Sequence, residues 1–315
     1  MLAIRKAEKF KQFARVCLWG VPKSGKTHSS LAIATSMVAV DGGKIAVISS
    51  EYGSSSLLAR KFPHDIIDLT VDEYGNKVKN PFAPGRYEDA INLLVESGYQ
   101  AIIIDSLSHA WEGEGGVLEE VGKKGKNSFS DGWGYGTPLY QHLINTILAA
   151  KAHIFITLRA KESYVVELND KGRNAPRNAG LKPVIRGNFG FEMQLTIRMD
   201  RLVGHIEESA FQDEFPQGTE VIRPGEDVAY TLLQCLDGTP QPEPSAQQTA
   251  MRSLLDEFYS LSPATYAKIA NWEQMALRKA LQIESGPLPT DYTDAQVNAM
   301  SAYVETKKKP QQKVA

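Results

Sequence analysis

The chain has 315 residues, 42% of them hydrophobic, a formal net charge of −2 and two cysteines, Cys17 and Cys235. This composition fits one large buried core with a small additional domain, and the lack of any run of about 18 apolar residues excludes a membrane span. Neither a secretory signal nor a disulfide framework is indicated, so we expect a cytoplasmic protein.

The first predicted elements flank a phosphate-binding motif. Residues 13–19 form a short apolar and aromatic run typical of a buried strand, and residues 27–40 carry small and apolar side chains at helical spacing. The segment between them has the pattern G-x-x-x-x-G-K-[ST] and reads Gly20, Val21, Pro22, Lys23, Ser24, Gly25, Lys26 and Thr27. These residues and His28, next in the helix, are expected to contact the nucleotide. The backbone N–H groups of such a loop surround phosphates. The motif therefore predicts ATP or GTP as ligand, with Lys26 on the β/γ-phosphates and Thr27 on Mg²⁺.

Apolar runs and helical stretches alternate along the rest of the core, which predicts an α/β fold with a mostly parallel sheet. The further strands are expected at 44–50, 65–70, 100–105, 152–158 and 193–199, and further helices at 86–97 and 138–150. After a core of 1–235, a Pro/Gln-rich linker is predicted at 236–248, a small helical module at 249–304 and a basic disordered tail at 305–315.

Two carboxylates follow predicted strands downstream of the loop. Asp105 ends the strand 100–105, where P-loop enzymes hold Mg²⁺. Glu51 follows the strand 44–50, where it could orient or deprotonate the water that attacks the γ-phosphate. From its position alone, a solvated loop glutamate is an equal alternative for Glu51.

A glycine-rich segment at 113–136 contains lysines and aromatic residues. Glycines permit mobility, cations attract phosphate and an exposed aromatic ring can stack on a base. The alternative is that Trp111 and Trp133 only fix this segment to the core. His109, close to the Asp105 strand, is expected to be a hydrogen-bonded structural residue, and no spaced His/Cys set predicts zinc.

A basic segment spans residues 159–186. Its seven basic residues outnumber three acidic ones, in a chain of negative net charge: Arg159, Lys161, Lys171, Arg173, Arg177, Lys182 and Arg186 against Glu162, Glu167 and Asp170. Such a concentration favours a loop that follows the phosphates of a nucleic acid. A hairpin whose cations reach a neighbouring subunit's nucleotide, or only water, is the alternative.

These motifs together resemble the ATPase core of RecA-type recombinases. The order of the P-loop, Ser50-Glu51-Tyr52-Gly53, Asp105-Ser106-Leu107 and Thr157-Leu158-Arg159 carries the resemblance. It is closer still to short phage-encoded RecA-like ATPases, a group classed with AAA-type ATP-binding proteins and associated with single-strand annealing. The blocks IIIDSLSHAWEGEGG and APRNAGLKPVIR look like that group, and the similarity covers about residues 1–235.

The resemblance implies roles for the site residues and an activity. It implies that Glu51 is the catalytic base, that Asp105 belongs to the Mg²⁺ site and that Thr157 senses the γ-phosphate, where RecA itself has glutamine. It further implies an oligomeric ring or filament that hydrolyses ATP on single-stranded DNA in phage recombination or replication, in the host cytoplasm, with a single-strand-binding protein as a possible partner. A nucleotide-gated scaffold with little turnover is the alternative, and a small-molecule phosphotransferase is less favoured because no acceptor pocket or lid motif is evident.

Overall fold

The structure of the chain is a computed structural model that describes residues 11–39, 42–51, 53–125, 129–168, 174–187, 189–236, 250, 254 and 293–308. The chain divides into two compact units, residues 1–239 and 240–315. Helix α9 (Asp294–Lys308) belongs to the second unit, and the other helices and strands named below belong to the first.

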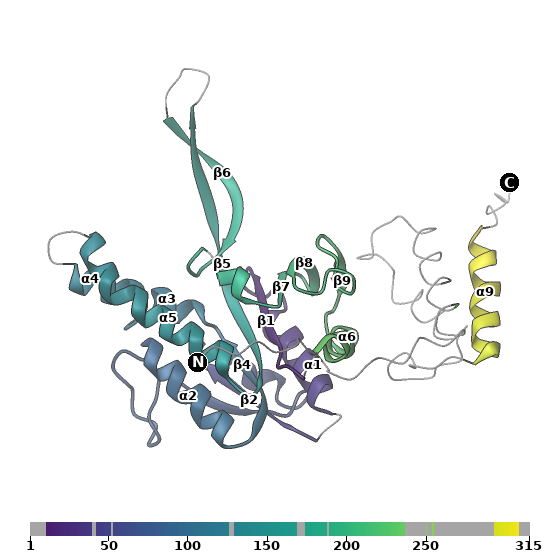
Figure 1. Cartoon of the computed structure of the whole chain (residues 1–315), viewed down its shortest axis with the longest axis horizontal. Coiled ribbons are helices and arrows are strands. Elements are labelled where there is room, and N and C mark those ends of the chain that lie inside the picture. Colours follow the sequence, from purple (N-terminus) through teal and green to yellow (C-terminus); the bar gives the residue numbers. More distant parts are fainter. Residues whose placement is uncertain are drawn as a thin grey trace, which may run out of the picture. The chain divides into compact units, whose positions relative to one another are not determined.

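The described part of the first unit contains one mixed sheet with helices between its strands (Figure 1). The strands are β1 (Arg15–Gly20), β2 (Lys44–Ser49), β3 (Asp65–Asp68), β4 (Tyr99–Asp105), β5 (His153–Leu168), β6 (Asn174–Pro183), β7 (Leu195–Asp200), β8 (Val203–Ser209) and β9 (Glu220–Ile222). The α-helices are α1 (Lys26–Ala39), α2 (Pro84–Glu96), α3 (Ser108–Glu112), α4 (Val117–Lys124), α5 (Trp133–Ala149) and α6 (Glu226–Leu236). Short 3-10 helices are η1 (Ser54–Leu58), η2 (Phe129–Gly132) and η3 (Phe189–Glu192).

The strand order is β3-β2-β4-β5-β1-β7-β8-β9, and β6 pairs with β5 outside this path. The six strands from β3 to β7 run parallel, whereas β7-β8, β8-β9 and β5-β6 are antiparallel pairs. Continuous apolar runs suit central parallel strands because both faces are covered, and Ile102, Ile103 and Ile104 of β4 are fully buried. β5 thereby lies between the strand of the P-loop and the strand of Asp105.

Helices cover both faces of the sheet and form two cores. Helices α1 and α6 pack on one face, where Val16 and Leu18 of β1 join Leu31 and Leu232. On the other face, α2 to α5 cover β2, β4 and the inner part of β5. The alternate residues of β1, Cys17 and Trp19, point to this second face, as the period of two in a strand requires.

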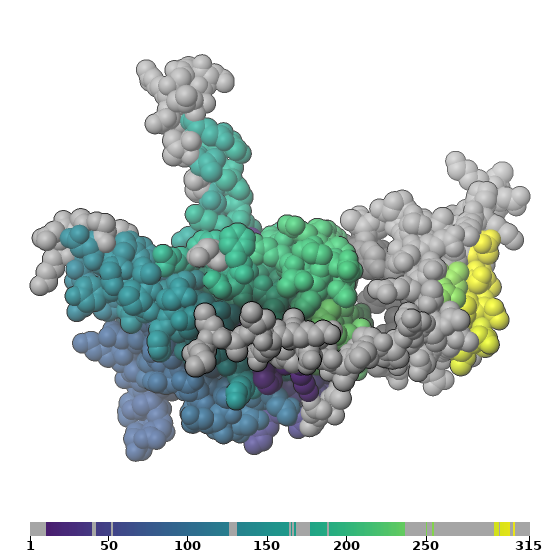
Figure 2. Space-filling view, viewed as in Figure 1, coloured from purple at the N-terminus to yellow at the C-terminus, as the bar shows by residue number. Residues whose placement is uncertain are grey.

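A long β-hairpin made of β5 and β6 projects from the sheet (Figures 1 and 2). The first residues of β5 pair with β1 and β4, but beyond Arg159 the strand pairs with β6 alone. One strand thus belongs both to the buried sheet and to an exposed projection.

The predicted α/β fold with a mostly parallel sheet is confirmed, and each strand and helix predicted in the core is present. The antiparallel strands β8 and β9 and the helices α3, α4 and α6 do not follow from the sequence analysis, which offers the hairpin of β5 and β6 only as an alternative for the basic segment. The predicted linker and most of the helical module lie outside the described residues. Helix α9 extends to Lys308, beyond the predicted boundary at 304, and residues 309–315 lie outside the described residues.

Candidate nucleotide-binding site

The loop between β1 and α1 has a backbone that demands glycine at two positions. Gly20 has φ +158° and Gly25 has φ +102°. A Cβ on Gly20 would lie 2.3 Å from the carbonyl oxygen of Met199, and one on Gly25 would lie 2.5 Å from Leu202. The loop can therefore close around a ligand only without these side chains. The hydroxyl of Ser24 is buried in it and has no hydrogen-bond partner among the described residues.

Lys26 begins α1 and folds back over the loop. Its ammonium group donates hydrogen bonds to the carbonyl oxygens of Gly20, at 3.0 Å, and Val21, at 2.9 Å. Burial lowers the pKa of Lys26, and the carboxylates of Asp105 and Glu51 oppose this shift. Among the described residues, the hydrogen bonds of this half-buried ammonium go to neutral carbonyl oxygens. It is well placed to exchange them for a phosphate, because hydrogen bonds between two charged groups are stronger.

Asp105, at the end of β4, is held by two threonine hydroxyls. Thr27 of α1 donates to Oδ2 at 2.8 Å, and Thr157 of β5 donates to Oδ1 at 2.5 Å. The exposed fraction of Asp105 is 3% and that of Thr157 is 0%. Burial raises the pKa of Asp105, whereas the hydrogen bonds from Thr157 and Thr27 act in the opposite direction. The site thus brings together the P-loop helix, the Asp105 strand and the strand between them.

Glu51 lies beyond the end of β2 and is paired with Arg159. The guanidinium Nε of Arg159 donates to Glu51 Oε1 at 2.9 Å, although the two residues are 108 positions apart. Both side chains are partly exposed, at 46% for Arg159 and 30% for Glu51. The predicted catalytic glutamate therefore lies at the same edge of the sheet as Asp105, but with a cation as partner.

Ser50 and His109 support this edge of the sheet. The Ser50 hydroxyl exchanges hydrogen bonds with the carbonyl oxygen (2.9 Å) and the N–H (2.8 Å) of Ser106 and lies 2.7 Å from His109 Nδ1. The His109 ring stacks on Phe82 at 4.7 Å. Burial lowers the pKa of His109. These contacts agree with the structural role expected for His109, whereas the motif that contains Ser50 does not predict this role for its hydroxyl.

The residues present fit a magnesium ion bound with a nucleotide. Mg²⁺ prefers hard oxygen ligands such as carboxylate and hydroxyl groups, and Thr27 Oγ1 and an Asp105 oxygen lie 2.8 Å apart beside the loop. The loop itself is a cradle that a Cβ at Gly20 or Gly25 would fill. Thr27 and Asp105 would hold the ion, directly or through water, and the loop would hold the phosphates.

The family model described as an AAA domain matches residues 12–209, more than half of the chain. The chain belongs to the AAA domain family. Membership indicates nucleotide binding and hydrolysis, as the geometry of the loop also does. A KaiC-like protein from the hyperthermophilic archaeon Pyrococcus horikoshii is similar in structure, with a TM-score of 0.39 and 12% identity over 69% of this chain and 89% of its own. No curated protein sequence matches the chain significantly.

The basic residues of 159–186 occupy different places in this AAA domain. Lys161 and Lys182 are opposite one another at the base of the hairpin, and Arg177, on β6, forms a two-bond ion pair with Glu167. Arg186 instead stacks on α5, with its guanidinium 5.7 Å from the Trp133 ring and 5.6 Å from the Tyr140 ring. Arg173 lies outside the described residues.

Other predicted residues have plain structural surroundings. His28, expected at the nucleotide, lies 2.9 Å from the Lys61 ammonium and edge-on to Phe62. In the glycine-rich segment, Trp111 is buried against Trp133 and Tyr140, which supports the role of fixing this segment to the core. Among the described residues, no helix is long and apolar enough to span a bilayer.

We expect Asp105→Asn to stabilise the nucleotide-free protein at neutral pH while weakening Mg²⁺-ATP binding. Because burial raises the pKa of this carboxyl above its ordinary value of 3.8, its ionisation destabilises the fold above that raised pKa, and the cost disappears as the pH falls below 3.8. Thermal unfolding from pH 4 to 8 should show a higher midpoint for the variant at pH 8, converging with the wild type near pH 4.

Asp72→Asn is the matched control, because the pKa of Asp72 is shifted in the opposite direction from that of Asp105. Asp72 is exposed and its pKa is lowered, chiefly by a hydrogen bond from the Asn76 backbone, so its ionised form contributes stability above the ordinary pKa and this contribution is lost in acid. The control should be less stable than the wild type at pH 8. A lower midpoint for Asp105→Asn at pH 8 would contradict the burial argument.

Proposed function

We propose that this AAA domain is a Mg²⁺-dependent ATPase that acts on single-stranded DNA and whose turnover is stimulated by that DNA. The observation that carries the proposal is the path of β5. This strand contacts Asp105 through Thr157, contacts Glu51 through Arg159 and then continues into the cationic hairpin. A ligand on the hairpin would therefore act on a strand that also forms the nucleotide site.

In this proposal, different side chains bind the phosphates, hold the metal and activate the attacking water. The loop N–H groups and Lys26 bind and orient the phosphates, and Thr27 with Asp105 holds the metal. Mg²⁺, when bound, neutralises charge that develops on the phosphoryl oxygens. Glu51 orients the attacking water and accepts its proton, which requires the carboxylate to leave the guanidinium of Arg159.

The hairpin supplies features that suit a single strand of DNA. Cations along a groove follow the phosphates, and the affinity falls with salt as counterions are released. Lys161 and Lys182 are exposed at the base of the hairpin, and Lys182 forms no ion pair among the described residues. The resemblance to phage RecA-like ATPases supports the same ligand and also supports self-association into a ring or filament, which we include in the proposal.

Steady-state phosphate release with Mg²⁺-ATP, with and without single-stranded DNA, tests the proposal. We expect DNA to raise the rate and Lys26→Ala to abolish release in both conditions, because the variant lacks the cation that reaches the β/γ-phosphates. Tight ATP binding without release in either condition would contradict the proposal and favour a nucleotide-gated scaffold.

Glu51→Gln should keep ATP binding and lower the hydrolysis rate by about 10²- to 10⁴-fold, the usual contribution of a general base. Nucleotide affinity and single-turnover hydrolysis measure the two effects separately. Glu73→Gln, which changes an exposed glutamate outside the site, is the control and should hydrolyse ATP normally. Normal hydrolysis by Glu51→Gln would show that another group is the base.

Arg159→Ala should raise hydrolysis in the absence of DNA and reduce its stimulation by DNA. The partly exposed pair of Arg159 with Glu51 is worth about 0.2–1 kcal/mol, so its loss should speed basal turnover by up to about fivefold. The ratio of rates with and without DNA is the readout, and Arg60→Ala, at an exposed position outside the hairpin, is the control. An unchanged ratio would mean that the Glu51 pair does not transmit DNA binding.

A further inference from the structure

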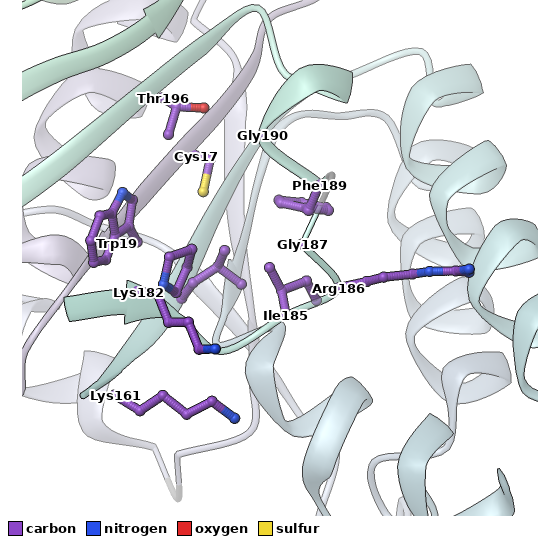
Figure 3. Close-up of a pocket in the computed structure, with 12 residues that line it drawn as sticks. Cys17, Trp19, Lys161, Lys182, Ile185, Arg186, Gly187, Phe189, Gly190 and Thr196 are labelled. Atoms are coloured by element: carbon purple, nitrogen blue, oxygen red, sulfur yellow. The ribbon is translucent and has the colours of Figure 1, made fainter. Parts of the chain in front are cut away.

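A pocket of about 300 Å³ lies at the base of the hairpin, on the opposite face of β1 from α1 (Figure 3). Cys17, Trp19 and Leu158 contribute from β1 and β5, Thr196 from β7 and Phe189 from η3. Helices α2 to α5 cover the neighbouring strands on this face. The pocket lies over β1 and β7, beside the segment of chain that follows β6. The pocket is separate from the phosphate-binding loop.

Two lysines stand at this pocket from neighbouring strands. Lys161 of β5 and Lys182 of β6 are directly opposite in the antiparallel pair, and both line the pocket. Figure 3 shows both side chains extended on the same side of it. Like charges opposite one another destabilise a sheet, and Lys161 forms an ion pair with Glu112 in which the charged atoms are 3.6 Å apart. An anion at this place would remove the repulsion.

The inner end of the pocket is apolar with one unpaired polar group. The Thr196 hydroxyl is buried, at 6% exposure, and has no hydrogen-bond partner among the described residues. A buried hydroxyl without a partner is costly, so a ligand atom that pairs with it gains affinity. A ligand with a flat apolar part, a polar edge and an anion matches these features.

We propose that this pocket takes one base of a single-stranded DNA, with the adjoining phosphate between Lys161 and Lys182. The inference rests on the proposed function and names a subsite for its DNA. Recognition of single strands combines cations for phosphates with aromatic rings for base faces. Both are present here, because Lys161 and Lys182 line the pocket together with Trp19 and Phe189.

The pocket also connects to the nucleotide site through the strands that they share. Leu158 lines the pocket, while its neighbours Thr157 and Arg159 contact Asp105 and Glu51. Trp19 lines the pocket and immediately precedes Gly20 of the P-loop. A base in the pocket would therefore contact Leu158 and Trp19, which are adjacent in the chain to residues of the nucleotide site.

The experiment compares an oligothymidylate with an abasic strand of the same length, each labelled with a fluorophore, in Mg²⁺-ATP. The wild type should bind the strand with bases about tenfold more tightly, the effect of one stacked base. Gly187→Leu places a side chain at the pocket, where a Cβ meets no atom within 4 Å. This variant should bind both strands with the affinity that the wild type has for the abasic strand. Gly85→Leu, at an equally open glycine of α2, is the control and should keep the preference.

A second variant tests the phosphate contact without changing the buried residues. Lys182→Ala, at an exposed position, should weaken the binding of both strands. It should also make the negative slope of log affinity against log salt shallower by about 0.7. Thermal unfolding of each variant checks that it is folded.

Three other binding results would overturn either the base pocket alone or the proposed function as well. Equal binding of the two strands by the wild type would overturn the base pocket and leave the DNA-stimulated ATPase standing. A preference for bases that survives in Gly187→Leu would place base recognition elsewhere and also overturn it. Failure of the wild type to bind either strand would overturn the proposed function itself, and this inference with it.

Discussion

The organisation of the site depends on one buried carboxylate. Asp105 is almost fully buried, and an ionised group in such a place needs hydrogen bonds to offset the loss of water. Thr27 and Thr157 supply them from elements on either side of β4 in the sequence. Because both donors bind the same group, a movement of the P-loop helix or of β5 away from β4 would remove a hydrogen bond from a buried carboxylate. The carboxylate therefore fixes how the P-loop helix, β4 and β5 meet at the site where phosphate and metal would bind.

The same constraint explains how an exposed hairpin can be linked mechanically to the nucleotide site. A hairpin attached by a flexible loop would bind its ligand without affecting the core. Here β5 runs without interruption from the Thr157 contact, past the Arg159 pair with Glu51, to the hairpin. Coupling between distant sites requires an element with two arrangements that both sites bias. Under the proposed function, the partly exposed Arg159–Glu51 pair would be such an element, because it is weak enough to exchange and the proposal gives the glutamate a second role.

Local patterns in the sequence predict the fold class and the residues of the site, but not the contacts between them. The P-loop, Asp105 and Glu51 follow from a motif and from the ends of apolar runs. The predicted strand 152–158 stops where burial stops, yet β5 continues to Leu168 because β6 pairs with it in solvent. Charge counting groups Arg186 with the hairpin cations, whereas it packs on two aromatic rings of α5. The Arg159–Glu51 pair and the pocket arise from the order of strands in the sheet, which local periodicity does not encode.

The register of β5 restricts how related chains can vary the hairpin. Side chains alternate between the two faces of a strand, so a single inserted residue turns every later side chain to the other face. The hairpin contains one irregularity in its pairing, between Glu162 and Tyr164, just beyond Lys161. An extra residue added at this point changes the faces of the outer hairpin and leaves Thr157, Arg159 and Lys161 in place. The outer hairpin can thus diverge in length and ligand while the part next to the ATP site stays constant.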